Sequence, residues 1–170
     1  AGAGARDVLD VLAARCNVGA CAVNMGDMGV GEKEFDIVGR LIRKKSGSRA
    51  TRRELLANSY MGIICRVRGE YPEAEEHYKK ALKSCVQLKD HEGIANQLGN
   101  IGILYRHTGD HPMAYRSLNT CLVYSERMGY RDGIRFSCEN IYGMLTGTGQ
   151  KSEARKFKEL YSSRYPGLDL

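Results

Sequence analysis

The sequence predicts an all-α protein, an α-solenoid of about four stacked antiparallel helix pairs. The first observation is an internal repeat: one stretch reads MGIICRVRGEYPEAEEHYKKAL (61–82) and another IGILYRHTGDHPMAYRSLNTCL (101–122), so that their matching residues lie 40 positions apart. The second is that a glycine followed by a proline interrupts both stretches at the same place, as at a turn between two helices. A repeated helix pair is typical of a solenoid, because one pair alone cannot bury its apolar face.

The composition is that of a globular domain. The chain has 170 residues, of which 42% are apolar and 27% are charged, a balance that argues against intrinsic disorder. No apolar run approaches the roughly 18 residues that a transmembrane segment needs. Six cysteines are present and none forms a CxxC pair. We therefore expect buried, reduced thiols in an intracellular, cytoplasmic protein, with no metal and no cofactor.

The first unit has the weakest repeat pattern. Residues 1–14 are expected to form an N-terminal extension and residues 15–53 a degenerate first repeat. Gly29 lies 40 residues before Gly69, and we interpret the stretch around it, GDMGVG, as the turn of this repeat. The stretch has neither the spacing of a Walker loop nor its Lys-Ser/Thr ending, which argues against phosphate binding.

Positive charge is concentrated in the basic connector 40–53 of this first repeat. The formal net charge of the chain is +6, and the connector, RLIRKKSGSRATRR, contains no acidic residue. We define the candidate basic patch as Arg43, Lys44, Lys45, Arg49, Arg52 and Arg53. Three interpretations stay open: binding of nucleic acid or anionic lipid, a localisation or kinase-recognition segment around Ser46, and a solvated loop that leads into the next helix.

The second repeat, 54–92, shows the pattern most clearly. Apolar residues between 54 and 68 follow helical spacing with a broad buried face. Gly69 is expected to end this helix, because glycine adopts a positive φ at little cost. Pro72 suits the first turn of a second helix. Glutamates follow Pro72 and lysines come later, which places charges of the favourable sign at both ends of the helix dipole.

The remaining repeats follow the same plan. The third repeat, 93–131, carries Gly109 and Pro112 at its turn. The fourth repeat, 132–164, keeps the turn glycine but has no proline there, and residues 165–170 are expected to form a tail.

These residues resemble the tetratricopeptide repeat, in the long 40-residue form that is similar to the repeats of kinesin light chain and of Leu-Gly-Asn-repeat adaptors. In that family a small residue on the first helix, here Gly62 and Gly102, lets the two helices approach closely. The fourth unit departs from the pattern with Tyr142 at this position. The first unit departs from it with Glu34 at the small position of its second helix. The resemblance implies a right-handed superhelix with a concave groove lined by the first helices.

The resemblance also implies which residues face that groove. The candidate ligand-groove residues are Ser59, Ile63, Arg66, Asn96, Gly99, Ile103, Arg106 and His107. Two arginines one repeat apart, each close to an isoleucine, favour a cleft that pairs a carboxylate or phosphate and holds an apolar anchor. The alternative is that both arginines are solvated helix ends or pair with acids of the next repeat. The asparagine that related adaptors place at the ninth position is replaced by isoleucine here.

No catalytic or metal-binding set is evident in the sequence. His107 and His111 flank Asp110, but Gly109 and Pro112 interrupt the helix between them, so the histidines are not expected to share a face. No Ser-His-acid or Cys-His set occurs at a recognisable spacing. We therefore expect a protein that is not an enzyme.

The function predicted from the sequence is a scaffold or adaptor that binds a protein or peptide partner, acidic in character, in the groove. One alternative is binding of nucleic acid or anionic lipid through residues 40–53. Another is a regulatory domain of a larger enzyme, suggested by a chain that begins at Ala1. Terminal repeats without a polar outer face would also favour self-association.

Overall fold

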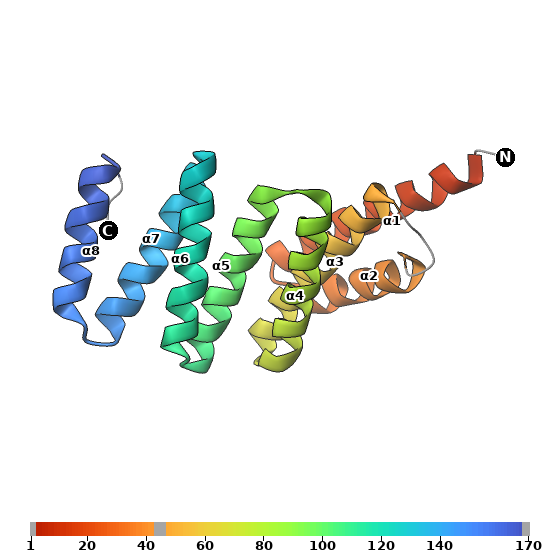
Figure 1. Cartoon of the computed structure of the whole chain (residues 1–170). Coiled ribbons are helices and arrows are strands. Elements are labelled where there is room, and N and C mark those ends of the chain that lie inside the picture. The colour runs from red at the N-terminus through yellow and green to blue at the C-terminus, as the bar shows by residue number, and fades with distance from the viewer. Residues whose placement is uncertain (1–2, 43–46, 168–170) are drawn as a thin grey trace. The chain divides into compact units, whose positions relative to one another are not determined.

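The computed structural model describes residues 3–42 and 47–167, and every regular element in these ranges is an α-helix (Figure 1). The described residues form eight helices that pack as consecutive antiparallel pairs: α1 (Ala3–Asn24), α2 (Met28–Ile42), α3 (Ser48–Arg68), α4 (Tyr71–Leu88), α5 (His91–Thr108), α6 (His111–Met128), α7 (Arg131–Gly147) and α8 (Lys151–Arg164). The prediction of an all-α fold built from sequential helix pairs is confirmed. None of the described helices is long and apolar enough to cross a membrane.

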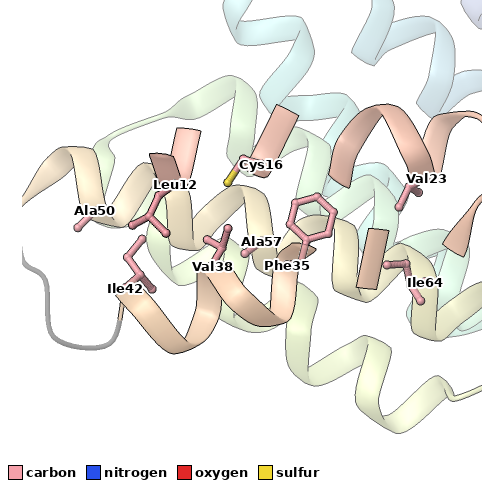
Figure 2. Close-up of a cluster of buried hydrophobic side chains, with 9 residues drawn as sticks. All are labelled: Leu12, Cys16, Val23, Phe35, Val38, Ile42, Ala50, Ala57 and Ile64. Carbon is pink, nitrogen blue, oxygen red and sulfur yellow. The ribbon is translucent and has the colours of Figure 1, made fainter. Parts of the chain in front are cut away.

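The chain divides into two compact units, Ala1–Asp90 with α1 to α4 and His91–Leu170 with α5 to α8. In the first unit, α3 packs against both helices of the preceding pair as well as against α4. Figure 2 shows the buried cluster that α1, α2 and α3 share: Leu12, Cys16, Val23, Phe35, Val38, Ile42, Ala50, Ala57 and Ile64. The ring of Phe35 also stacks on Tyr60 of α3, with 5.1 Å between the ring centroids.

The second unit is arranged in the same way, with α7 in the place that α3 has in the first unit. Helix α7 packs against α6, α5 and α8. The buried cluster of this unit consists of Leu118, Leu122, Ile134, Cys138, Ile141, Leu145 and Ala154. Thus α6 and α7 supply most of its apolar side chains, whereas α8 supplies one fully buried residue, Ala154.

Each helix pair turns at a glycine with a positive φ angle: 89° at Gly26, 80° at Gly69, 78° at Gly109 and 77° at Gly149. Only glycine adopts this conformation without strain. Gly29, which we expected at the first turn, lies inside α2 instead. The first turn therefore lies 43 residues before Gly69 rather than 40.

The helix that follows this turn confirms the 43-residue interval. Asp27 Oδ1 accepts a hydrogen bond from the backbone N–H of Val30 at 3.0 Å. Asp110 caps α6 in the same way, through the N–H of Met113 at 3.0 Å. The equivalent of the small residue Ala74 is then Gly31, at which a Cβ atom would meet Val23.

Glu34, which we expected at that small position, lies elsewhere. Its carboxylate pairs with Arg15 of α1 at 2.7 Å. The expectation that Glu34 occupies the small position of α2 was wrong, because it assumed an interval of 40 residues throughout the chain.

Close approach of the paired helices depends on a second set of glycines. A Cβ atom at Gly62 would lie 2.5 Å from Tyr78 Cε1, and one at Gly102 would lie 2.6 Å from Leu118 Cγ. Gly19 faces Phe35 in the same way, at 2.9 Å from Cε2. In these three pairs, a glycine of the first helix faces a fully buried large side chain 16 residues later.

The fourth pair is built differently. Tyr142 occupies the glycine position, and Lys158 of α8 occupies the position of the large side chain. The Lys158 ammonium lies over the Tyr142 ring, 5.7 Å from its centroid, so a cation–π contact replaces apolar packing.

Replacing Gly62 by alanine should lower the free energy of unfolding by roughly 1–2 kcal/mol, because the new methyl group must displace the buried Tyr78 ring. This cost exceeds the gain of about 1 kcal/mol that alanine normally brings to a helix interior. Urea unfolding followed by circular dichroism measures the change.

Gly143→Ala is the matched control, since a Cβ atom at Gly143 of α7 meets nothing within 4 Å. This variant should be more stable than the wild type by about 0.5–1 kcal/mol. If the free energy of unfolding changed in the same direction in Gly62→Ala and Gly143→Ala, the close approach at Gly62 would be contradicted.

Candidate functional site

The predicted groove residues of the first unit lie on α3, and all three are half-buried. Ser59 donates a hydrogen bond to the carbonyl oxygen of Leu55 at 2.8 Å. Ile63 packs against the cluster that α1, α2 and α3 share. Ser59 and Ile63 are therefore engaged within the first unit. Arg66 is the charged residue of the three.

Arg66 lies beside the phenol group of Tyr78. Its Nε atom donates a long hydrogen bond of 3.4 Å to the Tyr78 hydroxyl. Burial raises the pKa of Tyr78, and the hydrogen bond from Arg66 acts in the opposite direction. The guanidinium is therefore held at the C-terminal end of α3, next to the side chain that fixes the α3–α4 pair.

Arg106 of α5 reaches across to the next first helix. Its Nη1 atom donates a hydrogen bond to Oδ1 of Asn140 on α7. Asn140 in turn donates through Nδ2 to the carbonyl oxygen of Phe136 at 2.7 Å, so its amide is oriented by its own helix. An amide accepts the hydrogen bond but carries no charge, and this contact leaves the positive charge of Arg106 unneutralised.

Two further predicted groove residues lie on α5 close to α7. A Cβ atom at Gly99 would lie 2.7 Å from Cε1 of Phe136, so this glycine makes room for the aromatic ring. Asn96 is exposed, and its Oδ1 atom accepts a hydrogen bond of 3.4 Å from the Tyr130 hydroxyl. Ile103 is half-buried and His107 is exposed further along the same helix.

A recess of about 330 Å³ lies where these residues meet. It is lined by Asn96 and Asn100 of α5, Cys121 of α6, and Tyr130, Asp132, Gly133 and Phe136 at the start of α7. The two asparagines are one helical turn apart, and each amide can donate and accept hydrogen bonds. The recess thus combines two amide groups, two aromatic rings and the carboxylate of Asp132.

Sequence reasoning missed Asn100 and Asn140. Both were outside the positions that the family resemblance assigned to the groove. A signal was nevertheless present, because the two asparagines lie 40 residues apart and so recur at the repeat interval.

The cysteines are poor candidates for nucleophiles. Burial raises the pKa of Cys65 and of Cys85 to about 11, and that of Cys138 to about 12. Burial also raises the pKa of Cys121 in the recess. These thiols therefore stay protonated at neutral pH, whereas a thiolate is the reactive form. In the part of the chain that the structure describes, no group of three or more metal-binding side chains occurs.

Half of the candidate basic patch, namely Arg43, Lys44 and Lys45, lies outside the described residues. Arg49, Arg52 and Arg53 lie in the first two turns of α3 rather than in a loop. Arg49 forms an exposed ion pair with Asp10 at 3.4 Å.

A separate cleft of about 490 Å³ lies between α2, α3 and α4. His77 of α4 lies in its wall, and Nδ1 of this histidine is 2.9 Å from Oδ1 of Asn58. Burial lowers the pKa of His77, Lys80 adds to this effect, and Glu76 and Asp36 oppose it. His77 is therefore kept neutral in the folded chain over a wider pH range than a free histidine.

Comparison with known proteins identifies part of the chain. Residues 53–122, from α3 into α6, match the family model of the tetratricopeptide repeat. Repeats of this family are in general protein-interaction modules and are typically non-catalytic. No curated protein matches the chain.

The lowered pKa of His77 makes stability depend on pH. Below the ordinary histidine pKa of 6.5 the unfolded chain binds a proton that the folded chain resists, so stability should fall as the pH drops below this value. Unfolding midpoints at about pH 8 and about pH 5, on either side of the histidine pKa, measure the loss.

His77→Gln should show a smaller loss of stability on acidification than the wild type, because glutamine keeps the contact with Asn58 but does not titrate. His91→Gln is the control, since His91 is exposed. An equal loss in the wild type and in His77→Gln would contradict this role of His77.

Proposed function

We propose that this chain, with its tetratricopeptide-repeat region at 53–122, is a non-enzymatic scaffold or adaptor that binds an extended segment of a partner protein along the face that its first helices α5 and α7 share. The observation that carries the proposal is the recess between α5 and α7, where two asparagine amides lie beside two aromatic rings. The 40-residue interval supports the long form of the repeat, as in kinesin light chain and Leu-Gly-Asn-repeat adaptors.

The chemistry of the recess suits a peptide backbone. An extended peptide exposes one N–H and one C=O group per residue, and an asparagine side chain can pair with both. Asn96 and Asn100 lie on one face of α5, one turn apart, and so can contact neighbouring peptide groups. The Phe136 ring offers an apolar surface for a side chain of the peptide.

Arg106, near the recess, suits an acidic residue of the partner, and the one carboxylate in the wall of the recess, Asp132, is paired with Arg135 at 3.4 Å. Arg106 lies on the same helix as the two asparagines, and its hydrogen bond to the neutral Asn140 leaves its charge available to a carboxylate. Arg66 occupies the equivalent position of α3, 40 residues earlier. A peptide with an aspartate or glutamate near an apolar residue is therefore the expected ligand.

The proposal also includes the compartment in which the chain acts. All six cysteines are free of disulfide bonds, which supports a reducing compartment such as the cytoplasm.

The basic segment 40–53 remains the second candidate function, as a site for nucleic acid or anionic lipid. Steeply salt-dependent binding, lost when the arginines of α3 in this segment are neutralised, would favour it.

Selection from a library of random peptides displayed on phage tests the groove. The chain should enrich peptides that contain an acidic and an apolar residue, and Arg106→Glu should weaken binding of the selected peptides by at least about tenfold, a loss of roughly 1.4 kcal/mol. Asn100→Ala should weaken binding as well, and fluorescence anisotropy with a labelled peptide measures both effects.

Arg116→Glu is the matched control, because Arg116 is exposed on the second helix α6 and should not contact the peptide. Arg66→Glu tests the equivalent face of α3 by itself. Unchanged affinity in the Arg106, Asn100 and Arg66 variants, each shown by circular dichroism to be folded, would contradict the groove assignment.

A further inference from the structure

We propose that the recess of about 330 Å³ between α5 and α7 holds an arginine side chain of the partner segment. This arginine lies about four residues along the partner from the acidic residue that pairs with Arg106. The inference rests on the proposed function, because it names a side chain that enters the same site.

A carboxylate lies in the wall of the recess where α7 begins. Asp132 is in the first turn of α7, and Nη2 of Arg135 lies 3.4 Å from its Oδ1 atom. The exposed fraction of the side chain is 78% for Asp132 and 61% for Arg135, and a long, exposed ion pair of this kind contributes little. A cation brought by the partner can therefore share the Asp132 carboxylate.

A second carboxylate acts on the same place. Glu92 lies in the first turn of α5, 40 residues before Asp132, and forms no ion pair with another residue that the structure describes. Burial raises the pKa of the Tyr130 hydroxyl in the recess, and the negative charges of Glu92 and Asp132 raise it further. Two carboxylates thus lie near the phenol group, which favours a cation in the recess.

The arginines at the start of α7 do not line the recess. Arg131 and Arg135 line a separate cleft of about 350 Å³, together with residues of α8. The charged residue in the wall of the recess itself is Asp132. The two clefts therefore differ in the sign of the charge that they present to a ligand.

Two aromatic rings in the recess suit a guanidinium group. The rings of Phe136 and Tyr130 each pack closely against backbone: a Cβ atom at Gly99 would lie 2.7 Å from Cε1 of Phe136, and one at Gly133 would lie 2.5 Å from Cδ1 of Tyr130. A guanidinium is planar, so it can stack on an aromatic ring while it pairs with a carboxylate. The alkyl stem of arginine can pack on the same rings. These properties favour arginine over lysine.

The floor of the recess is polar. The side chains of Ser125 on α6 and Ser137 on α7 are fully buried, and neither hydroxyl has a hydrogen-bond partner in the part of the chain that the structure describes. Burial raises the pKa of Cys121 in the recess wall, and these two nearby hydroxyls act in the opposite direction. Polar groups around the recess reduce the cost of taking a charged head group out of water. The recess is therefore better suited to a charged side chain than a purely apolar pocket.

The positions of Asp132 and Arg106 set the spacing of the two charges on the partner. Arg106 donates a hydrogen bond to Asn140, which lies eight residues after Asp132 on α7. Eight residues of an α-helix span about 12 Å. An extended peptide covers this distance in about four residues, at roughly 3.3 Å each.

Phage selection with charge-reversed variants tests the inference without a known ligand. The wild type should enrich peptides with an arginine about four positions from an aspartate or glutamate. Asp132→Lys should select peptides in which an acidic residue replaces this arginine, because like charges repel, and the acidic residue opposite Arg106 should stay. Arg106→Glu should show the reverse, with the arginine kept and the acidic residue lost.

Glu159→Lys is the matched control for Asp132→Lys. Glu159 is exposed and is paired with Arg155 of its own helix at 2.8 Å, but it lies on the second helix α8 and outside the recess. This variant should enrich the same peptides as the wild type. Circular dichroism shows whether each variant is folded.

A selected peptide and its citrulline analogue test the charge itself, since citrulline has nearly the shape of arginine but no charge. In fluorescence anisotropy with labelled peptides, the replacement should weaken binding to the wild type by at least about fivefold. With Asp132→Asn, a milder change than Asp132→Lys, the two peptides should differ by about twofold or less, because the partner of the charge is gone.

The outcomes separate this inference from the proposed function. Wild-type peptides without an arginine, whose binding is nevertheless weakened by Arg106→Glu, would overturn the inference and leave the proposed function standing. Enriched sequences that change in neither Asp132→Lys nor Arg106→Glu would overturn both. An equal loss on citrulline replacement in the wild type and in Asp132→Asn would place the arginine outside the recess and overturn the assignment to Asp132.

Discussion

The close approach of two paired helices is the constraint on which the rest of this fold depends. A first helix carries a glycine where the second helix inserts a large, fully buried side chain, as Gly62 does for Tyr78 and Gly102 for Leu118. The buried ring or branched chain could not be accommodated if the glycine had a Cβ atom. Because this contact occupies one face of α1, α3 and α5, only the other faces of these helices are left for further contacts. On α5, the contact of Gly102 with Leu118 thus limits which residues are left for the proposed peptide contact.

Departures from this constraint are as informative as its repetition. The fourth pair has Tyr142 and Lys158 in place of a glycine and a large apolar residue. A cation–π contact at a partly exposed site contributes about 0.5–1 kcal/mol, less than the burial of a leucine or tyrosine side chain. Helix α8 accordingly has Ala154 as its single buried residue. Local opening of α8 is therefore expected to need less energy than opening of α6.

Much of the architecture could be predicted from the sequence, because turns and close approaches depend on single residues. Gly69, Gly109 and Pro112 mark turns whatever the rest of the fold does. The first pair was aligned wrongly because we assumed an interval of 40 residues, which selects Gly29 as the turn glycine. The observed interval is 43 residues, and the turn glycine is Gly26. Turn glycines can thus be placed from the sequence where the repeat interval stays at 40 residues. They are misplaced where this interval changes, as it does between the first and second repeats.

The candidate site was harder to predict, because side chains of different helices define it. Gly99 was expected to face a ligand, and the structure shows that it makes room for the Phe136 ring. The amide partner of Arg106 on α7 could not be read from one helix alone. Asn100 lies in the wall of the recess although no position rule assigned it there.

The central claim, that the face between α5 and α7 binds a peptide, is tested most directly by nuclear magnetic resonance. Titration of the ¹⁵N-labelled chain with a selected acidic peptide should shift the side-chain amide signals of Asn96, Asn100 and Asn140 and the backbone signals around Phe136. Shifts gathered instead around the cleft of about 690 Å³ that Tyr115, Phe157 and Leu160 help to line, with the asparagine amides unmoved, would contradict it.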